Sequence, residues 1–124
     1  MKVLLDTNAL LWLLADDPKL SVAARRDIER ATVIMISEAS LWEIAIKVSI
    51  GKLTPIPKLY NVIDDLGFRR LHFEDNYLQK LEVLPMVHRD PFDRMLVAQA
   101  LSEKASLVTR DTFLKKYGVN IIAT

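Results

Sequence analysis

The sequence has no cysteine and only two histidines among its 124 residues. Without cysteine, neither a disulfide framework nor a thiolate metal site is available. No apolar run approaches the roughly 18 residues that a membrane-spanning helix needs. The chain also lacks a strong charge of either sign, since 17 basic and 16 acidic residues leave a net charge of +1. This balance argues against a protein that holds nucleic acid by bulk charge alone.

Any contact with nucleic acid is therefore expected to be local. The candidate basic patches are Arg25-Arg26, Arg69-Arg70, Arg89 with Arg94, and Lys115-Lys116. The first residues have some features of a signal peptide, but Asp6 and Asn8 interrupt the apolar region. We expect a single domain over residues 1–124, because 51% hydrophobic residues suffice for a single core at this length. The absence of cysteine fits a cytoplasmic location, which we also expect.

The first eight residues, Met1 to Asn8, contain a short apolar run that stops at Asp6. An uninterrupted run of Val and Leu is typical of a strand buried on both faces, and ligands bind beyond the carboxyl ends of such strands. Asp6 is therefore placed where a site would be. The alternative is that Asp6 or Thr7 simply caps the helix predicted over residues 9–15.

Strand-like and helix-like segments alternate along the rest of the chain. Such alternation predicts an α/β fold in which a parallel sheet of about five strands is covered on both faces. The further strands are expected over residues 32–36, 68–73, 106–109 and 119–122. The further helices are expected over residues 21–31, 38–50, 58–66, 74–83, 90–104 and 111–116.

The helix over residues 38–50 is apolar on two stripes. Leu41, Ile44, Ala45 and Val48 form one, and Ala39, Ile46 and Ile50 form the other, on which Glu43 falls. A buried carboxylate is costly unless it is paired or binds a metal. Glu43 is thus a candidate site residue, and the alternative is an ordinary ion pair with Lys47 one helical turn later.

Three more acids lie near predicted strand or helix ends. Asp90 and Pro91 are good helix-start residues, and Asp93 heads the core-facing stripe of the helix that they begin. The alternative for Asp93 is a first-turn acid favoured by the helix dipole. Asp111 follows the strand over residues 106–109 as Asp6 follows the first strand.

The four carboxylates of Asp6, Glu43, Asp93 and Asp111 are all expected at the same edge of the sheet. Two unneutralised charges about 4 Å apart repel by about 4 kcal/mol at an effective dielectric constant of about 20. Carboxylate oxygens suit Mg²⁺ or Mn²⁺. A metal-bound water can act as a nucleophile on a phosphate, so phosphodiester hydrolysis is the leading hypothesis.

At these residues the chain resembles the PIN-domain ribonucleases, in particular VapC toxins of toxin-antitoxin pairs. The resemblance rests on Asp6-Thr7-Asn8, Glu43, the run Asp90-Pro91-Phe92-Asp93-Arg94 with Leu96, Ala98 and Ala100, and Thr109-Arg110-Asp111. It implies a three-layer αβα sandwich and catalytic metal ligands at Asp6, Glu43, Asp93 and Asp111. Thr7, Asn8, Asp90 and Thr109 would support the site. It further implies Mg²⁺ or Mn²⁺ as cofactor, RNA as substrate, homodimerisation, and a VapB-like antitoxin that masks the active site.

Three other hypotheses are weaker. An aspartyl-nucleophile phosphatase needs a second Asp at the position of Asn8. A metal-independent ribonuclease normally needs catalytic histidine, and only His72 and His88 are available, of which His72 falls within a predicted strand. A receiver-like or scaffolding domain, acting through protein contacts, would keep an acidic pocket without cleavage; a receiver would need a lysine near Thr109 to Asp111. Trp12, in the apolar first helix, is expected in the core or at a partner interface.

Overall fold

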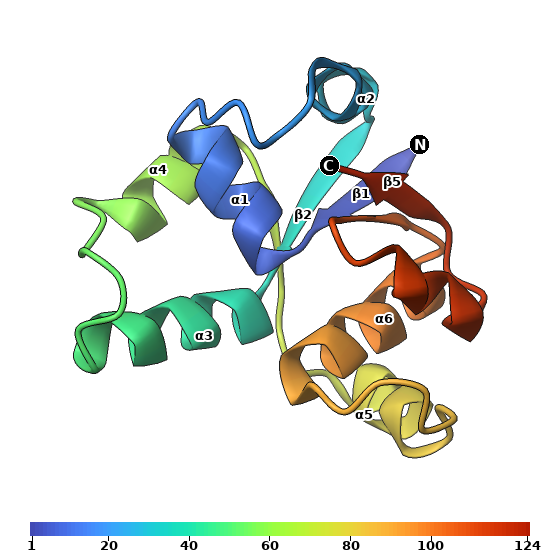
Figure 1. Cartoon of the computed structure of the whole chain (residues 1–124). Helices are drawn as coiled ribbons and strands as arrows, with labels where there is room; N and C mark the ends of the chain where they lie inside the picture. Colours follow the sequence, from blue (N-terminus) through green and yellow to red (C-terminus); the bar gives the residue numbers. More distant parts are fainter.

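The computed structural model describes all 124 residues. The chain forms a five-stranded, wholly parallel sheet with helices on both sides (Figure 1). The strands lie in the order β3-β2-β1-β4-β5, so that β1 is central. Leu5 at the end of β1 pairs with Ile36 of β2 and Val108 of β4. The strand bounds are β1 Lys2–Leu5, β2 Val33–Ser37, β3 Arg69–Leu71, β4 Ser106–Thr109 and β5 Ile121–Ala123.

The helices begin and end where the sequence supplies caps. Ser21, Ser37 and Asp90 each accept a hydrogen bond from a backbone N–H of the helix that they start. Gly51 and Gly67 follow helix ends with φ of +76° and +78°, which favours glycine. The helices are α1 Thr7–Leu14, α2 Val22–Arg30, α3 Glu38–Ser49, α4 Leu59–Asp65, α5 Asp75–Glu82, α6 Pro91–Glu103 and the 3₁₀ helix η1 Thr112–Tyr117.

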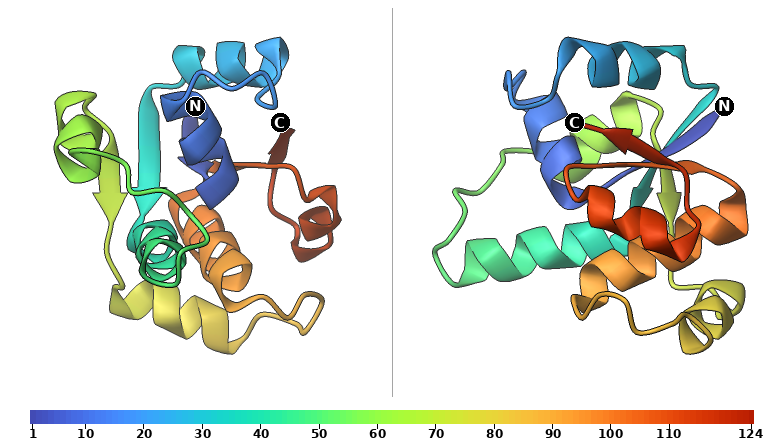
Figure 2. Two further views of the ribbon diagram at one scale, coloured as in Figure 1. Left: turned by 60° about the vertical axis from the view of Figure 1, so that its left-hand side comes forward. Right: turned by 45° about the vertical axis from the view of Figure 1, so that its right-hand side comes forward.

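Alternate residues of each central strand enter two separate cores. Leu4, Met35 and Leu107 join the core shared with α5 and α6, whereas Leu5 and Ile36 join the core shared with α1, α2 and α4. This alternation is the period of two of a strand. The result is the three-layer αβα arrangement that was expected, with α5 lying alongside α6 in both views of Figure 2.

Three expectations about the elements need correction. Strand β3 is shorter than residues 68–73, and β5 begins at Ile121 rather than Val119. The second apolar stripe of α3 is not buried, because Ile46 is 36% and Ile50 59% exposed. Only Ala39 at its start reaches a core, where α3 meets α6 beside the sheet edge. None of the helices combines the length and hydropathy needed to cross a lipid bilayer.

The strand order places a topological switch point between β1 and β4. From β1 the chain continues outward through β2 to β3, and from β4 it continues the other way to β5. The segments that leave the carboxyl ends of β1 and β4 therefore diverge to opposite sides of the sheet. In open parallel sheets, the crevice left at such a point is the usual ligand-binding position.

Candidate active site at the carboxyl edge of the sheet

Asp6 and Asp111 lie at the switch point. Asp6 directly follows β1, donates its backbone N–H to the Val108 carbonyl at 3.0 Å, and caps α1 by accepting the Ala9 N–H at 2.7 Å. Asp111 follows β4 and caps η1, its Oδ1 accepting the Phe113 N–H at 3.1 Å. Both acids therefore cap helices, as the alternative for Asp6 proposed, and both also follow neighbouring strands at the same edge of the sheet, where their charges interact.

Glu43 reaches this edge from the second turn of α3. Its Oε1 accepts a hydrogen bond from the Thr7 hydroxyl at 2.6 Å, which ties it to the residue after Asp6. Its Oε2 lies 3.3 Å from the Lys47 ammonium. The ion pair within α3 is thus present, but it coexists with the link to α1, and the Glu43 side chain is only 20% exposed.

Asp93 comes from the first turn of α6, where Asp90 is the N-cap. The Asp90 carboxylate accepts the Asp93 backbone N–H at 3.0 Å, so Asp90 holds the start of the helix that carries Asp93. The side chain of Arg94, which was grouped with Arg89 as a surface basic patch, instead forms hydrogen bonds within the protein. It donates to the Pro85 carbonyl and to the Tyr117 hydroxyl, each at 3.0 Å.

His88 also enters the acidic site, which sequence reasoning did not foresee. Its Nε2 lies 3.1 Å from Asp111 Oδ2 and 3.8 Å from Asp93 Oδ2. One ligand atom from each of these three side chains lies within 4.8 Å of the others. The signal available in the sequence was the position of His88 two residues before the Asp90 cap. His72, by contrast, just follows β3 and lies 2.6 Å from Glu38 with its side chain 62% exposed.

Burial and mutual repulsion change the titration of two of the acids. Burial raises the pKa of Asp6; hydrogen bonding to the Ala9 N–H and the Thr109 hydroxyl opposes this, and the charges of Glu43 and Asp111 add to it. Burial raises the pKa of Asp93 to about 6, and the neighbouring charges of Asp90, Asp6 and Asp111 contribute, while His88 opposes the rise. Electrostatically, then, Asp6 couples to Glu43, Asp93 and Asp111.

The supporting residues differ in what they contact. Thr7 binds Glu43, and the Thr109 hydroxyl accepts the Asp111 N–H at 3.1 Å. The exposed side chain of Asn8 makes no hydrogen bond within the chain. Asp6 caps the N-terminal end of α1, and Asp93 lies in the first turn of α6. The N-terminal end of a helix favours negative charge.

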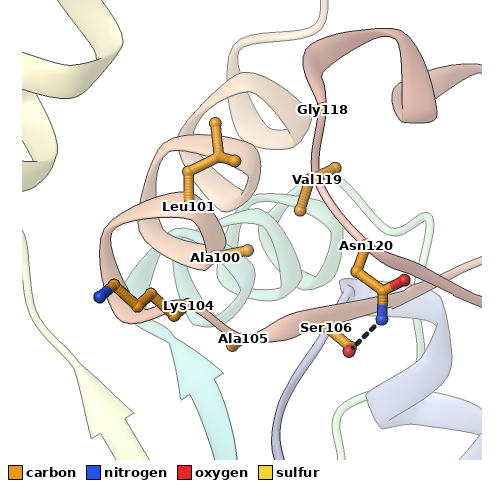
Figure 3. A pocket seen from close by; sticks show the side chains of 8 residues that line it. All are labelled: Ala100, Leu101, Lys104, Ala105, Ser106, Gly118, Val119 and Asn120. Atoms are coloured by element: carbon orange, nitrogen blue, oxygen red, sulfur yellow. Dashed lines mark hydrogen bonds between the residues drawn. The ribbon is translucent and has the colours of Figure 1, made fainter.

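A separate hollow of about 350 Å³ lies at the opposite, amino end of β4 (Figure 3). Its only charged side chain is Lys104, and its side-chain hydrogen bond runs from Asn120 to Ser106. Because it contains no carboxylate and faces away from Asp6 and Asp111, this hollow is distinct from the acidic cluster.

These features define an α/β domain with an acidic site beyond the carboxyl ends of a parallel sheet. The model of the PIN domain family matches residues 3–120, and the chain belongs to this family. PIN domains are in general nucleases. The resemblance noted in the sequence is thereby confirmed. No protein of curated function matches the chain at a significant level of sequence similarity.

Solved structures share the fold along almost the whole chain. A chain of VapBC2 from Rickettsia felis, bound to a DNA fragment from their promoter, matches with a TM-score of 0.73 and 16% identity, covering 99% of this chain and 98% of that one. DNA-bound VapBC from Salmonella typhimurium gives 0.68 and 17%, covering 99% and 98%. A toxin-antitoxin complex from Klebsiella pneumoniae gives 0.68 and 16%, covering 98% and 96%.

The raised pKa values predict how the stability of the metal-free protein depends on pH. Asp93 binds a proton more tightly in the folded state, so its stabilising contribution is complete below about pH 4 and is lost as pH rises through about 6. Since one pKa unit corresponds to about 1.4 kcal/mol, the loss from Asp93 is at most about 3 kcal/mol.

Chemical denaturation in EDTA at several pH values measures this loss. We expect Asp93→Asn to reduce the decline between pH about 4 and about 6, because the amide does not ionise, while Asp6, whose pKa is also raised, keeps its own share. The exposed Asp65, on α4, provides a matched control, and Asp65→Asn should leave the decline as in the wild type. A wild-type free energy of unfolding that rises with pH across this window would contradict the raised pKa of Asp93.

Proposed function

We propose that this protein is a metal-dependent ribonuclease that hydrolyses RNA phosphodiester bonds as the toxin of a VapBC-type toxin-antitoxin pair. One observation carries the proposal: within a PIN fold, the buried Asp6 and the partly buried Asp93 lie among other carboxylates, and this burial and repulsion raise their pKa values. Carboxylates whose pKa values are strongly perturbed by burial and by specific charged neighbours are typical of a functional site.

The residues present fit a hard divalent cation. Asp6, Glu43, Asp93 and Asp111 offer only oxygen atoms, which are the ligands that Mg²⁺ and Mn²⁺ prefer. Burial is the main cause of the raised pKa values of Asp6 and Asp93, and the repulsion from neighbouring carboxylates that adds to it is what a cation would relieve. We assign these four side chains as the metal-binding and catalytic carboxylates, with Thr7, Thr109 and Asp90 as supporting residues.

When bound, Mg²⁺ or Mn²⁺ supplies an activated water and offsets phosphate charge. The chain's own residues hold the acids in place for that role. Thr7 and Lys47 fix the two oxygens of Glu43. The Asp90 cap fixes the first turn of α6 and hence Asp93. The backbone N–H of Ala9 and the hydroxyl of Thr109 hold the carboxylate of Asp6.

RNA fits the groups near Asp111. The Arg110 guanidinium lies 5.5 Å from the centre of the Trp12 ring, and the Lys116 ammonium lies 4.2 Å from that of Phe113. Phe113 is 46% exposed and Trp12 is partly exposed. Exposed aromatic rings beside cations are typical surfaces for single-stranded nucleic acid, since bases stack on the rings and phosphates approach the charges.

The structural neighbours, which come from VapBC and other toxin-antitoxin complexes, support the toxin assignment. An apolar hollow of about 390 Å³ between α1, α2 and α4 provides a surface for a VapB-like partner. Seven of its eight lining residues are hydrophobic: Leu13, Leu14, Ile28, Ile34, Val62, Leu66 and Phe68, with Glu29 as the eighth. Homodimerisation stays a prediction from the family resemblance.

Asp6→Asn is expected to reduce RNA cleavage by at least about 100-fold, since it removes a charged oxygen ligand from the centre of the site. The test is cleavage of total RNA by purified protein with Mn²⁺, with EDTA and with Mn²⁺ restored. Asp65→Asn again serves as the matched control. Cleavage that persists in EDTA would instead favour histidine chemistry, and no cleavage under any condition would favour the non-catalytic, receiver-like interaction domain.

Mn²⁺ is expected to raise the Tm of the wild type by several degrees. A cation that binds only the folded state at about 100 times its Kd contributes about 2.7 kcal/mol of stability. Thermal melts with and without Mn²⁺ measure the effect. Asp93→Asn and Asp6→Asn should reduce the shift sharply, and an equal shift in both variants would place the cation elsewhere.

Leu66→Glu is expected to weaken binding of the antitoxin at least tenfold, or about 1.4 kcal/mol, while leaving RNA cleavage intact. Leu66 lines the apolar hollow yet is 55% exposed, so the substitution adds a charge there without opening the core. Co-purification with a co-expressed VapB-like antitoxin, followed by titration calorimetry, measures binding. Val22→Glu, at a residue that is 74% exposed and outside the hollow, is the matched control.

A further inference from the structure

His88 belongs to a loop that is fastened on both sides. Arg94 donates to the Pro85 carbonyl at 3.0 Å and to the Leu84 carbonyl at 3.5 Å, which anchors the start of the loop to α6. The Tyr117 hydroxyl accepts the His88 backbone N–H at 2.8 Å and a hydrogen bond from Arg94 at 3.0 Å. These contacts fix the backbone of His88 between α6 and η1.

The hydrogen bonds of the ring determine where its proton lies. Nδ1 of His88 accepts the backbone N–H of Asp90 at 3.0 Å. A nitrogen that accepts a hydrogen bond carries no proton, so the neutral ring has its N–H at Nε2. Nε2 is the atom that lies 3.1 Å from Asp111 Oδ2. The neutral imidazole therefore donates to the Asp111 carboxylate.

This arrangement is the reverse of the one found around metal-bound histidines. A ligating histidine uses a lone pair on one nitrogen and donates the N–H of the other to an acceptor. Here, binding a cation through Nε2 would move the proton to Nδ1, where it would meet the Asp90 N–H donor. Although His88, Asp93 and Asp111 lie close enough to share a cation, the hydrogen bonds favour a donor role for His88.

We propose that His88 is a positioning residue that acts through Asp111 and does not itself bind the cation, an inference that rests on the proposed metal-dependent function. The Phe113 N–H holds Oδ1 of Asp111, and the His88 Nε2–H holds Oδ2. Each oxygen keeps one lone pair for a cation. With both contacts the carboxylate plane is fixed beside Asp93; without His88 only the Phe113 contact remains.

The loss of such a partner of a metal ligand typically lowers metal affinity by about 10- to 100-fold. We therefore expect His88→Leu to bind Mg²⁺ and Mn²⁺ about tenfold more weakly than the wild type. His88→Gln keeps a side-chain N–H donor and should recover most of the lost affinity. His72→Gln is the matched control, because His72 contacts Glu38, outside the cluster.

The first measurement follows the proton directly. The chain has only two histidines, so imidazole ¹⁵N shifts, assigned with His72→Gln, report the tautomer of His88 at about pH 8.5, where a free imidazole is neutral. We expect the Nε2–H form both without metal and with saturating Mg²⁺, which is diamagnetic. A change to the Nδ1–H form on adding Mg²⁺ would mean that Nε2 ligates the cation and would overturn the proposal.

The second measurement is titration calorimetry of the wild type and the three variants with Mg²⁺ and with Mn²⁺. Wild-type affinity in His88→Leu, or no recovery in His88→Gln, would overturn the positioning role even though metal binding stands. Failure of the wild type to bind either cation would overturn the metal-dependent function as well. The tautomer measurement uses wild-type protein, so it decides the question even where His88→Leu does not fold.

Discussion

The structure depends on how a group of carboxylates is tolerated at one edge of a sheet. Two charges about 4 Å apart repel by about 4 kcal/mol at an effective dielectric constant of about 20, and burial adds a cost for each ionised group. The chain offsets this with the N-terminal ends of α1 and α6, with Lys47 beside Glu43, and with the N–H of His88 beside Asp111. The offset is incomplete, because the pKa values of Asp6 and Asp93 stay raised.

The fold produces this concentration of charge through its connections. A parallel sheet brings all strand carboxyl ends to one edge, and the strand order makes the segments after β1 and β4 diverge there. Asp6 and Asp111 are the residues at which those segments turn into helices, so the same side chains that end the strands also cap the next elements. Capping accounts for their backbone contacts, but it does not account for the placement of Glu43 and Asp93, which arrive from α3 and α6.

Much of this arrangement was predictable because helix caps and apolar strands depend mainly on residues that are close in the sequence. Ser21, Ser37 and the pair Asp90-Pro91 marked helix starts correctly, and the apolar runs located all five strands. The exposure of Ile46 and Ile50 was not predictable, because a periodic pattern does not say which of two apolar stripes finds a partner. The position of His88 was not predictable either, because it depends on a loop held by Arg94 and Tyr117. Tyr117 is distant from His88 in the sequence, and Arg94 lies within a motif that predicts only a helix.

The partial neutralisation of the cluster favours the proposed cation site over a scaffold that merely keeps the fold. A protein acting only through surface contacts would gain stability by replacing one of Asp6 or Asp93 with an amide, since the raised pKa values show that each ionised form is disfavoured in the fold. The chain instead keeps all four acids and also orients them, through Thr7 at Glu43, Asp90 at the start of α6, and His88 at Asp111. Uncompensated charge combined with fixed orientation is useful where a ligand of opposite charge completes the site, because the binding free energy then includes the repulsion that the ligand relieves. The same features that weaken the domain by itself would therefore strengthen its hold on the divalent cation that we propose.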